Sequence, residues 1–188
     1  MSRPDRRGSV VLIGGGARSG KSAFALSRAL ELGGKRAFIA TAQAFDREMT
    51  ARIAAHVRER GGAFETHEVP HALPEALHKV DADVVVIDCL TMWLSNQLLQ
   101  DRPIDRVLAE VDRLANVLEE RRMHALIVSN EVGMSLVPDN ALGRAFRDLT
   151  GNAHQRLAAI ADELYFAAMG VILRLRPDPV QVLARSTR

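Results

Sequence analysis

Residues 15–22 fit the pattern G-x-x-x-x-G-K-[ST], and this motif constrains the fold more than any other feature of the sequence. An apolar run, Val10 to Ile13, precedes it, and a segment of helical character, Ser22 to Leu32, follows it. A strand, a glycine-rich turn and a helix N-terminus in this order form a phosphate-binding loop, in which backbone N–H groups surround phosphate oxygens. The context therefore favours a nucleotide-binding α/β domain over a plain glycine-rich turn.

The side chains of the motif have separate predicted tasks. Lys21 is expected to reach the β- and γ-phosphates of a nucleoside triphosphate, and Ser22 to ligate Mg²⁺. A second metal carboxylate is expected at the end of a neighbouring buried strand, where Asp88 fits; its alternative role is to cap a turn. Gly14 lies outside the motif and should tolerate substitution best of the three consecutive glycines. The predicted phosphate-binding residues are Gly15, Gly16, Ala17, Arg18, Ser19, Gly20, Lys21 and Ser22.

Apolar β-branched runs alternate with longer amphipathic segments along the chain. The expected strands are residues 10–13, 37–40, 84–87, 125–128, 165–168 and 171–175, and the expected helices are residues 22–32, 47–60, 103–122 and 140–161. This alternation predicts one α/β domain with a mostly parallel central sheet and helices on both faces. The domain is expected to span residues 10–188, after a flexible N-terminal tail of residues 1–9.

The helix expected over residues 103–122 has the clearest amphipathic pattern. Apolar side chains at helical spacing predict one face turned toward the core. The residues assigned to this face are Ile104, Val107, Leu108, Val111, Leu114 and Leu118.

Composition limits the class of protein. A net charge of +2, with one Trp and one Tyr, offers little for nucleic-acid binding, so a DNA-dependent or motor-like NTPase is disfavoured. The single cysteine, Cys89, excludes an intrachain disulfide and is expected to be a small core residue rather than a reactive thiol. No apolar run approaches the ~18 residues of a membrane span, and the basic N-terminus does not resemble a secretory signal. The expected setting is the cytoplasm.

Two segments beyond the phosphate loop contain candidate catalytic side chains. His56, in the helix expected over residues 47–60, either packs against the sheet or acts as a nucleophile toward an α-phosphate. In the second case Arg52 and Arg58 would stabilise the phosphate charge. Asn130 and Glu131 follow the strand expected over residues 125–128, so their loop is either functional by position or shaped for packing.

The order of these motifs resembles the bifunctional adenosylcobinamide kinase / adenosylcobinamide-phosphate guanylyltransferase family of cobalamin biosynthesis. The resemblance runs from about Val10 to Leu175, and the stretches "SNEVGM" and "FRDLTG" are more specific than the phosphate loop. It implies a RecA-like P-loop NTPase fold and a homotrimer. His154 stands where the family often has Asn, Asp88 where some members have Glu, and Ala55 where some have a second histidine.

The resemblance also implies two reactions. ATP or GTP phosphorylates adenosylcobinamide with Mg²⁺; His56 then takes GMP from GTP and passes it to the adenosylcobinamide phosphate, which gives adenosylcobinamide-GDP. A P-loop kinase acting on another small alcohol, with a structural His56, is the alternative. A carboxylate at Glu68 would suit the N1–H and N2–H₂ donors of guanine. The further nucleotide contacts that the resemblance implies are Ala40, Thr41, Ala42, Val57, Arg58, Glu59, Arg60, Glu68 and Asp88.

Overall fold

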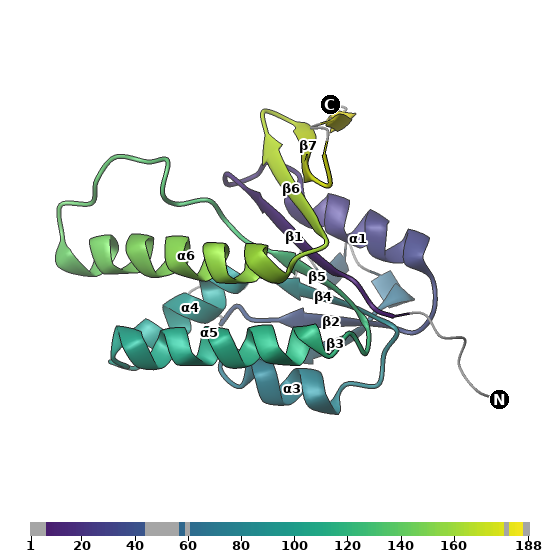
Figure 1. Cartoon of the computed structure of the whole chain (residues 1–188), viewed down its shortest axis with the longest axis horizontal. Coiled ribbons are helices and arrows are strands. Elements are labelled where there is room, and N and C mark those ends of the chain that lie inside the picture. Colours follow the sequence, from purple (N-terminus) through teal and green to yellow (C-terminus); the bar gives the residue numbers. More distant parts are fainter. Residues whose placement is uncertain (1–6, 44–56, 59–60, 179–180, 186–188) are drawn as a thin grey trace.

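The computed structural model describes residues 7–43, 57–58, 61–178 and 181–185 (Figure 1). Within these residues an eight-stranded sheet has the order β3-β2-β4-β5-β1-β6-β7-β8. The six strands from β3 to β6 are parallel, whereas β7 and β8 join antiparallel at one edge. The predicted mostly parallel sheet is therefore confirmed. The strands are β1 Val10–Gly15, β2 Arg36–Ala40, β3 Glu65–Glu68, β4 Val84–Asp88, β5 His124–Val128, β6 Glu163–Ala168, β7 Val171–Arg176 and β8 Gln181–Arg185.

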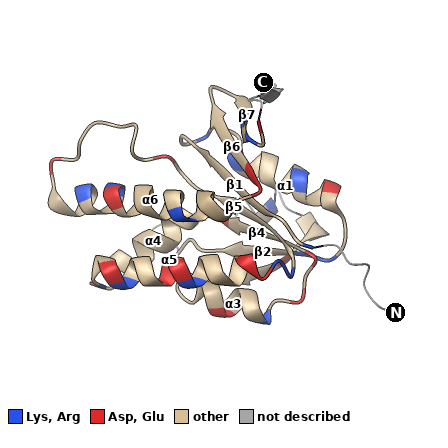
Figure 2. Ribbon diagram, in the orientation of Figure 1, with Lys and Arg blue, Asp and Glu red and all other residues tan. Residues whose placement is uncertain are grey.

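Helices cover both faces of the sheet, as the sequence predicts. Helix α1 (Lys21–Leu32) lies on one face, and α3 (Leu73–Lys79), α4 (Leu90–Leu98), α5 (Ile104–Glu119) and α6 (Ala141–Ile160) lie on the other (Figure 1). Successive strand residues point to opposite faces, so Val11 packs in the cluster with α1 while Leu12 packs in the cluster with the other four helices. Charged side chains of both signs occupy the outer side of α5 (Figure 2).

Several short elements were not predicted, and each lacks a readable period. Strand β3 has four residues, and β8 ends the sheet beyond β7. Helix α4 buries polar Asn96 and Gln97 as well as Trp93, so its sequence shows no polar face. Of the helix expected over residues 47–60, the structure describes only residues 57 and 58, which are helical.

One member of the predicted apolar face of α5 is wrong. Ile104 is 40% exposed, because it is the first residue of the helix and lies at the end of the face. Val107, Val111 and Leu114 are fully buried, and Leu118 is 5% exposed. The amphipathic period thus identified the face but not where the core ends along it.

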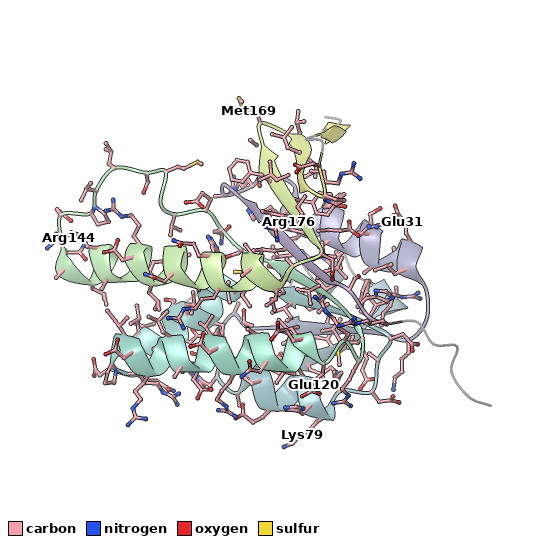
Figure 3. The ribbon with its side chains drawn as sticks, in the orientation of Figure 1. Glu31, Lys79, Glu120, Arg144, Met169 and Arg176 are labelled. Carbon is pink, nitrogen blue, oxygen red and sulfur yellow. The ribbon has the colours of Figure 1, made fainter. Side chains whose placement is uncertain are left out.

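The hairpin of β6 and β7 confirms the predicted pair of strands around Gly170. Met169 and Gly170 both have positive φ, 50° and 74°, at the turn. The Met169 side chain projects away from the sheet and is 97% exposed (Figure 3). Among the described residues no helix combines the length and apolar character that a bilayer crossing requires.

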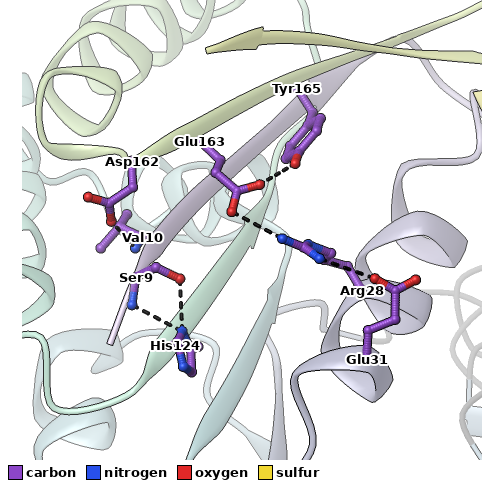
Figure 4. Close-up of polar contacts among 8 residues, drawn as sticks. All are labelled: Ser9, Val10, Arg28, Glu31, His124, Asp162, Glu163 and Tyr165. Atoms are coloured by element: carbon purple, nitrogen blue, oxygen red, sulfur yellow. Dashed lines mark hydrogen bonds and ion pairs between the residues drawn. The ribbon is translucent and has the colours of Figure 1, made fainter. Parts of the chain in front are cut away.

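Polar contacts tie together the amino ends of the central strands (Figure 4). Ser9 Oγ lies 2.8 Å from His124 Nδ1, and Val10 N–H donates to Asp162 Oδ2 at 2.7 Å. Gly8 N–H donates to the Arg121 carbonyl at 2.9 Å, so residues 8 and 9 of the predicted tail are hydrogen-bonded to the body. A cavity of about 340 Å³ at this edge contains none of the predicted site residues; it is lined by Arg7, Gly8, Ser9, Arg121 and Asp162.

Candidate active site

The phosphate loop connects the end of β1 to the start of α1, as predicted. Gly20 caps the helix with φ 93°, and Gly15 has φ 146°. A Cβ on Gly15 would lie 2.3 Å from the Ala167 carbonyl oxygen of the neighbouring strand β6. Glycine is therefore required at both positions, at Gly20 by backbone conformation and at Gly15 also by close packing.

Lys21 lies within the loop rather than in solvent. Its side chain is 6% exposed, its Nζ donates to the Gly16 carbonyl at 2.5 Å, and the Ser19 hydroxyl is 3.3 Å away. The free N–H groups of the first turn of α1 start at the same place, where the helix dipole favours negative charge. The loop thus combines an ammonium group and a helix N-terminus, which together suit an anionic phosphate.

The other predicted contacts lie along the carboxyl edge of the sheet. Ala40 of β2 pairs in register with Glu68 of β3 on one side and with Asp88 of β4 on the other. Adjacent strands are roughly 4.8 Å apart, so β4 lies about 10 Å and β3 about 19 Å from β1. Asp88 is therefore near the phosphate loop, whereas Glu68, which is exposed, lies toward the far end of the edge.

The Cys89 thiol is buried beside charges from both sides of this edge. Burial raises its pKa to about 11; the carboxylate of Asp88 adds to the rise, and the ammonium of Lys21 opposes it. Both charges are thus close enough to act on one buried sulfur atom. The predicted core role of Cys89 is confirmed, since the residue is 7% exposed.

Thr41 has a structural role that the sequence did not predict. Its side chain is fully buried, and its Oγ1 donates to the Cys89 carbonyl and accepts from the Cys89 N–H, at 2.7 and 2.8 Å. Asn96 Nδ2 donates to the Thr41 carbonyl at 2.8 Å. These contacts fix the end of β2 against β4. Contact between a nucleotide and the segment of Ala40, Thr41 and Ala42 stays a prediction.

The residues predicted to hold Mg²⁺ fit its chemistry. Ser22 and Asp88 are both partly exposed at the carboxyl edge and offer oxygen ligands, which this ion prefers. Magnesium usually binds through one or two protein oxygens together with water and substrate phosphates. Within the described part of the chain no group of three or more acidic, histidine or cysteine side chains forms a dedicated metal site.

The remaining predicted residues are only partly described. His56, Glu59 and Arg60 lie outside the described residues, so their predicted roles stay predictions. Val57 and Arg58 are exposed and helical. They follow the described end of β2 in sequence by more than a dozen residues.

A cluster on β5 and α6 was missed at the level of sequence. Ser129, fully buried at the end of β5, has its Oγ 2.7 Å from His154 Nε2. His154 Nδ1 lies 3.8 Å from Glu131 Oε2. The position of Asn130 and Glu131 after a buried strand marked the loop, but no sequence signal linked it to His154, which follows more than twenty residues later.

A phosphate loop after a buried strand, with an aspartate ending a strand two positions away in a mostly parallel sheet, defines a RecA-like P-loop NTPase. Two solved structures share this fold. The ATPase domain of a helicase matches with a TM-score of 0.51 at 14% identity, over 95% of this chain and 81% of that one. The RadB recombinase matches with a TM-score of 0.52 at 16% identity, over 97% and 83%.

The sequence comparisons are more specific. Residues 11–175 match the model of the cobinamide kinase / cobinamide phosphate guanyltransferase family. The bifunctional adenosylcobalamin biosynthesis protein CobP of Pseudomonas aeruginosa is 40% identical over 172 residues, which cover 90% of this chain and 98% of that protein. CobU of Escherichia coli is 33% identical over 181 residues, 89% and 99% of the two chains. The chain belongs to this family, and the resemblance inferred from its motifs is confirmed.

Proposed function

We propose that this chain phosphorylates adenosylcobinamide and then transfers GMP from GTP to the product. The family match over residues 11–175 supports both activities, and a kinase alone is not favoured. The single structural observation that supports nucleotide chemistry is the phosphate loop with Lys21 held inside it, 6% exposed.

In the first reaction the loop holds the triphosphate of ATP or GTP. Backbone N–H groups of residues 15–20 and the ammonium of Lys21 stabilise the charge on the transferring γ-phosphoryl group, mostly by position and electrostatics. Ser22 and Asp88 would hold Mg²⁺, which when bound neutralises phosphate charge. The substrate hydroxyl attacks in line, and the nucleoside diphosphate leaves.

In the second reaction His56 is the nucleophile. A neutral imidazole nitrogen attacks the α-phosphorus of GTP, a nitrogen–phosphorus bond forms, and pyrophosphate leaves with the electron pair of the broken phosphorus–oxygen bond. A phosphate oxygen of adenosylcobinamide phosphate then displaces the histidine. Glu68 accepts hydrogen bonds from the guanine edge, and Ala40, Ala42 and the residues from Val57 to Arg60 contact the nucleotide.

We also infer that the working form is a cytoplasmic homotrimer. A corrinoid is large for a chain of 20.6 kDa, so a cleft between subunits suits it better than one within a subunit. Light scattering on the purified protein should give about three times the mass of the chain. A monomer at micromolar concentration would contradict the trimer.

The guanylylation step can be tested with GTP labelled at the α-phosphate. The protein should acquire acid-labile, base-stable label, and the variant His56→Asn should acquire none. His78→Asn is a matched control, because His78 is exposed on α3 and should label normally. Full labelling of His56→Asn would refute the nucleophile. Phosphorylation without any label on the wild-type protein would favour the kinase alternative.

The phosphate loop can be tested by removing its ammonium group. Lys21→Ala should lower the rate of adenosylcobinamide phosphorylation by roughly 10²-fold or more, because a preorganised charge on the phosphates is lost. Lys79→Ala removes an ammonium at the end of α3 and should leave the rate unchanged (Figure 3). Equal rates for the two variants would exclude the predicted role of Lys21.

A further inference from the structure

The end of β5 occupies the position between the two parts of the predicted phosphate site. In the sheet order, β5 lies directly between β1, which leads into the phosphate loop, and β4, which ends at Asp88. Ser129 N–H donates to the Ile13 carbonyl at 3.0 Å, and Glu131 N–H donates to the Gly15 carbonyl at 2.9 Å. The backbone of residues 129–131 therefore lies alongside the first residue of the phosphate loop. A side chain there is adjacent to both the transferred phosphate and its metal.

Three polar side chains stand at this position, and two of them are turned to other elements. Ser129 is fully buried and contacts His154 on α6. Asn130 Nδ2 donates to Thr91 Oγ1 on α4 at 3.1 Å. Glu131 is different, because 23% of its side chain is exposed at the carboxyl edge. The long segment that follows it leads away from the sheet to α6 (Figure 1).

The Glu131 carboxylate is held from two directions. Its Oε1 accepts the Gly133 N–H at 2.5 Å, and its Oε2 faces His154 Nδ1 at 3.8 Å, within ion-pair range but too long for a hydrogen bond. A carboxylate next to Nδ1 favours the neutral tautomer with its proton on Nδ1. Nε2 then accepts from the Ser129 hydroxyl, so the buried serine fixes the imidazole ring and the ring faces the carboxylate.

The other acidic side chains at the predicted site are less suited to take a proton near the γ-phosphate. Asp88 is the expected metal ligand, and a metal-bound carboxylate is a weak base. Glu68 lies on β3, four strand spacings or about 19 Å from β1. Glu131 is next to β1, it is partly open to solvent, and it has lone pairs beyond those used by Gly133.

We propose that Glu131 is the carboxylate that accepts the substrate hydroxyl proton during phosphoryl transfer, and that His154 and Ser129 position it. This rests on the proposed kinase function. The hydroxyl oxygen forms a bond to the γ-phosphorus as its O–H bond breaks and the proton passes to Glu131. The bond from the γ-phosphorus to the bridging oxygen breaks, and its electron pair leaves with the nucleoside diphosphate.

The direct test compares Glu131→Gln with Glu119→Gln, which changes an exposed glutamate at the end of α5. Glutamine keeps the shape of the side chain and its acceptor for Gly133 but cannot take the proton. We expect kcat for phosphorylation of adenosylcobinamide to fall by about 10²-fold or more in Glu131→Gln, with little change in KM. Glu119→Gln should match the wild type. A kcat within threefold of wild type, or a loss confined to KM, would overturn the proposal.

Positioning by His154 is tested by a double-mutant cycle. His154→Leu should lower kcat several-fold in the wild-type background and have no further effect in the Glu131→Gln background, because both changes act through one carboxylate. A merely structural histidine would lower kcat equally in both backgrounds, which would overturn its role. His154→Asn, a smaller polar change, repeats the cycle if His154→Leu does not fold.

The failure of the proposed function would look different. Wild-type protein that does not phosphorylate adenosylcobinamide would refute the kinase function itself. Transfer of α-phosphate label to the protein provides a separate measure, because His56 rather than Glu131 is its nucleophile. Normal labelling of Glu131→Gln, together with its reduced kcat, is the result that we expect. Labelling reduced as much as kcat would point to general damage and would overturn the specific role of Glu131.

Discussion

Polar residues at the carboxyl edge divide into those that build the edge and those that face outward from it. The hydroxyl of Thr41 and the amide of Asn96 are used to join β2, β4 and α4. Ser22 and Asp88 are partly exposed and available to a ligand. The difference is invisible in the sequence, because threonine, serine and asparagine suit either role. It depends on which neighbouring backbone groups need a partner.

At the level of single residues, Gly15→Ala should be far more damaging than Gly14→Ala. A methyl group on Gly15 would meet the Ala167 carbonyl at 2.3 Å, whereas the nearest atoms to one on Gly14 are 3.8 Å away. We expect Gly15→Ala to weaken binding of ATP at least tenfold, measured by calorimetry. Binding by Gly14→Ala should stay within about twofold of wild type. Equal affinities would mean that the loop accommodates the methyl group.

At the level of elements, helix α5 shows where amphipathic period is reliable. Val107, Val111 and Leu114 are buried as their spacing predicts, since a helix resting on a sheet presents one stripe to it. Helix α4 lies deeper and buries Trp93 and Leu94 together with Asn96 and Gln97, so no stripe marks it. Period identifies helices at the surface, and it fails for a short helix enclosed by others.

Two alanine substitutions on α5 should separate the core from its end. Leu114→Ala removes a fully buried side chain and should lower the free energy of unfolding by about 2–5 kcal/mol. Ile104→Ala, at a position 40% exposed, should cost less than about 1 kcal/mol. Urea unfolding followed by circular dichroism measures both. Comparable losses would mean that Ile104 is buried in solution, for instance by another subunit.

At the scale of the whole molecule, the sheet separates two kinds of environment. Its amino edge is tied by contacts such as Ser9 with His124, and its carboxyl edge presents the phosphate loop and Glu131. His154 connects α6 to this carboxyl edge. Burial lowers its pKa, although the charge of Glu131 opposes the effect, so the native state favours the neutral ring.

The stability of the whole chain should therefore fall in acid partly because of His154. In the unfolded chain its pKa is about 6.5, so below this pH the unfolded state binds a proton that the native state resists. Stability is complete above about pH 6.5 and is lost as the pH falls through the lower native pKa. The free energy of unfolding should drop less for His154→Asn than for wild type between about pH 7.5 and 5.5. Equal drops would show that His154 does not contribute.

The sequence by itself determined the phosphate loop, the alternating strands and helices, and the family. These follow from local information: a glycine pattern with a required conformation, a period of two or 3.6 residues, and contiguous motifs such as "SNEVGM". Most of the candidate site is included, because Lys21, Ser22 and Asp88 each come directly after a strand. Ligands in a parallel sheet bind beyond these carboxyl ends.

Tertiary structure alone decided which side chains meet across that edge. Strand order places β5 between the phosphate loop and Asp88, although β5 follows β4 by some forty residues and β1 by more than a hundred. It also brings His154 from α6 onto Ser129 and Glu131. Such contacts depend on the order of strands and the packing of helices. These arise from burial of apolar surface over the whole chain, and no local pattern encodes them.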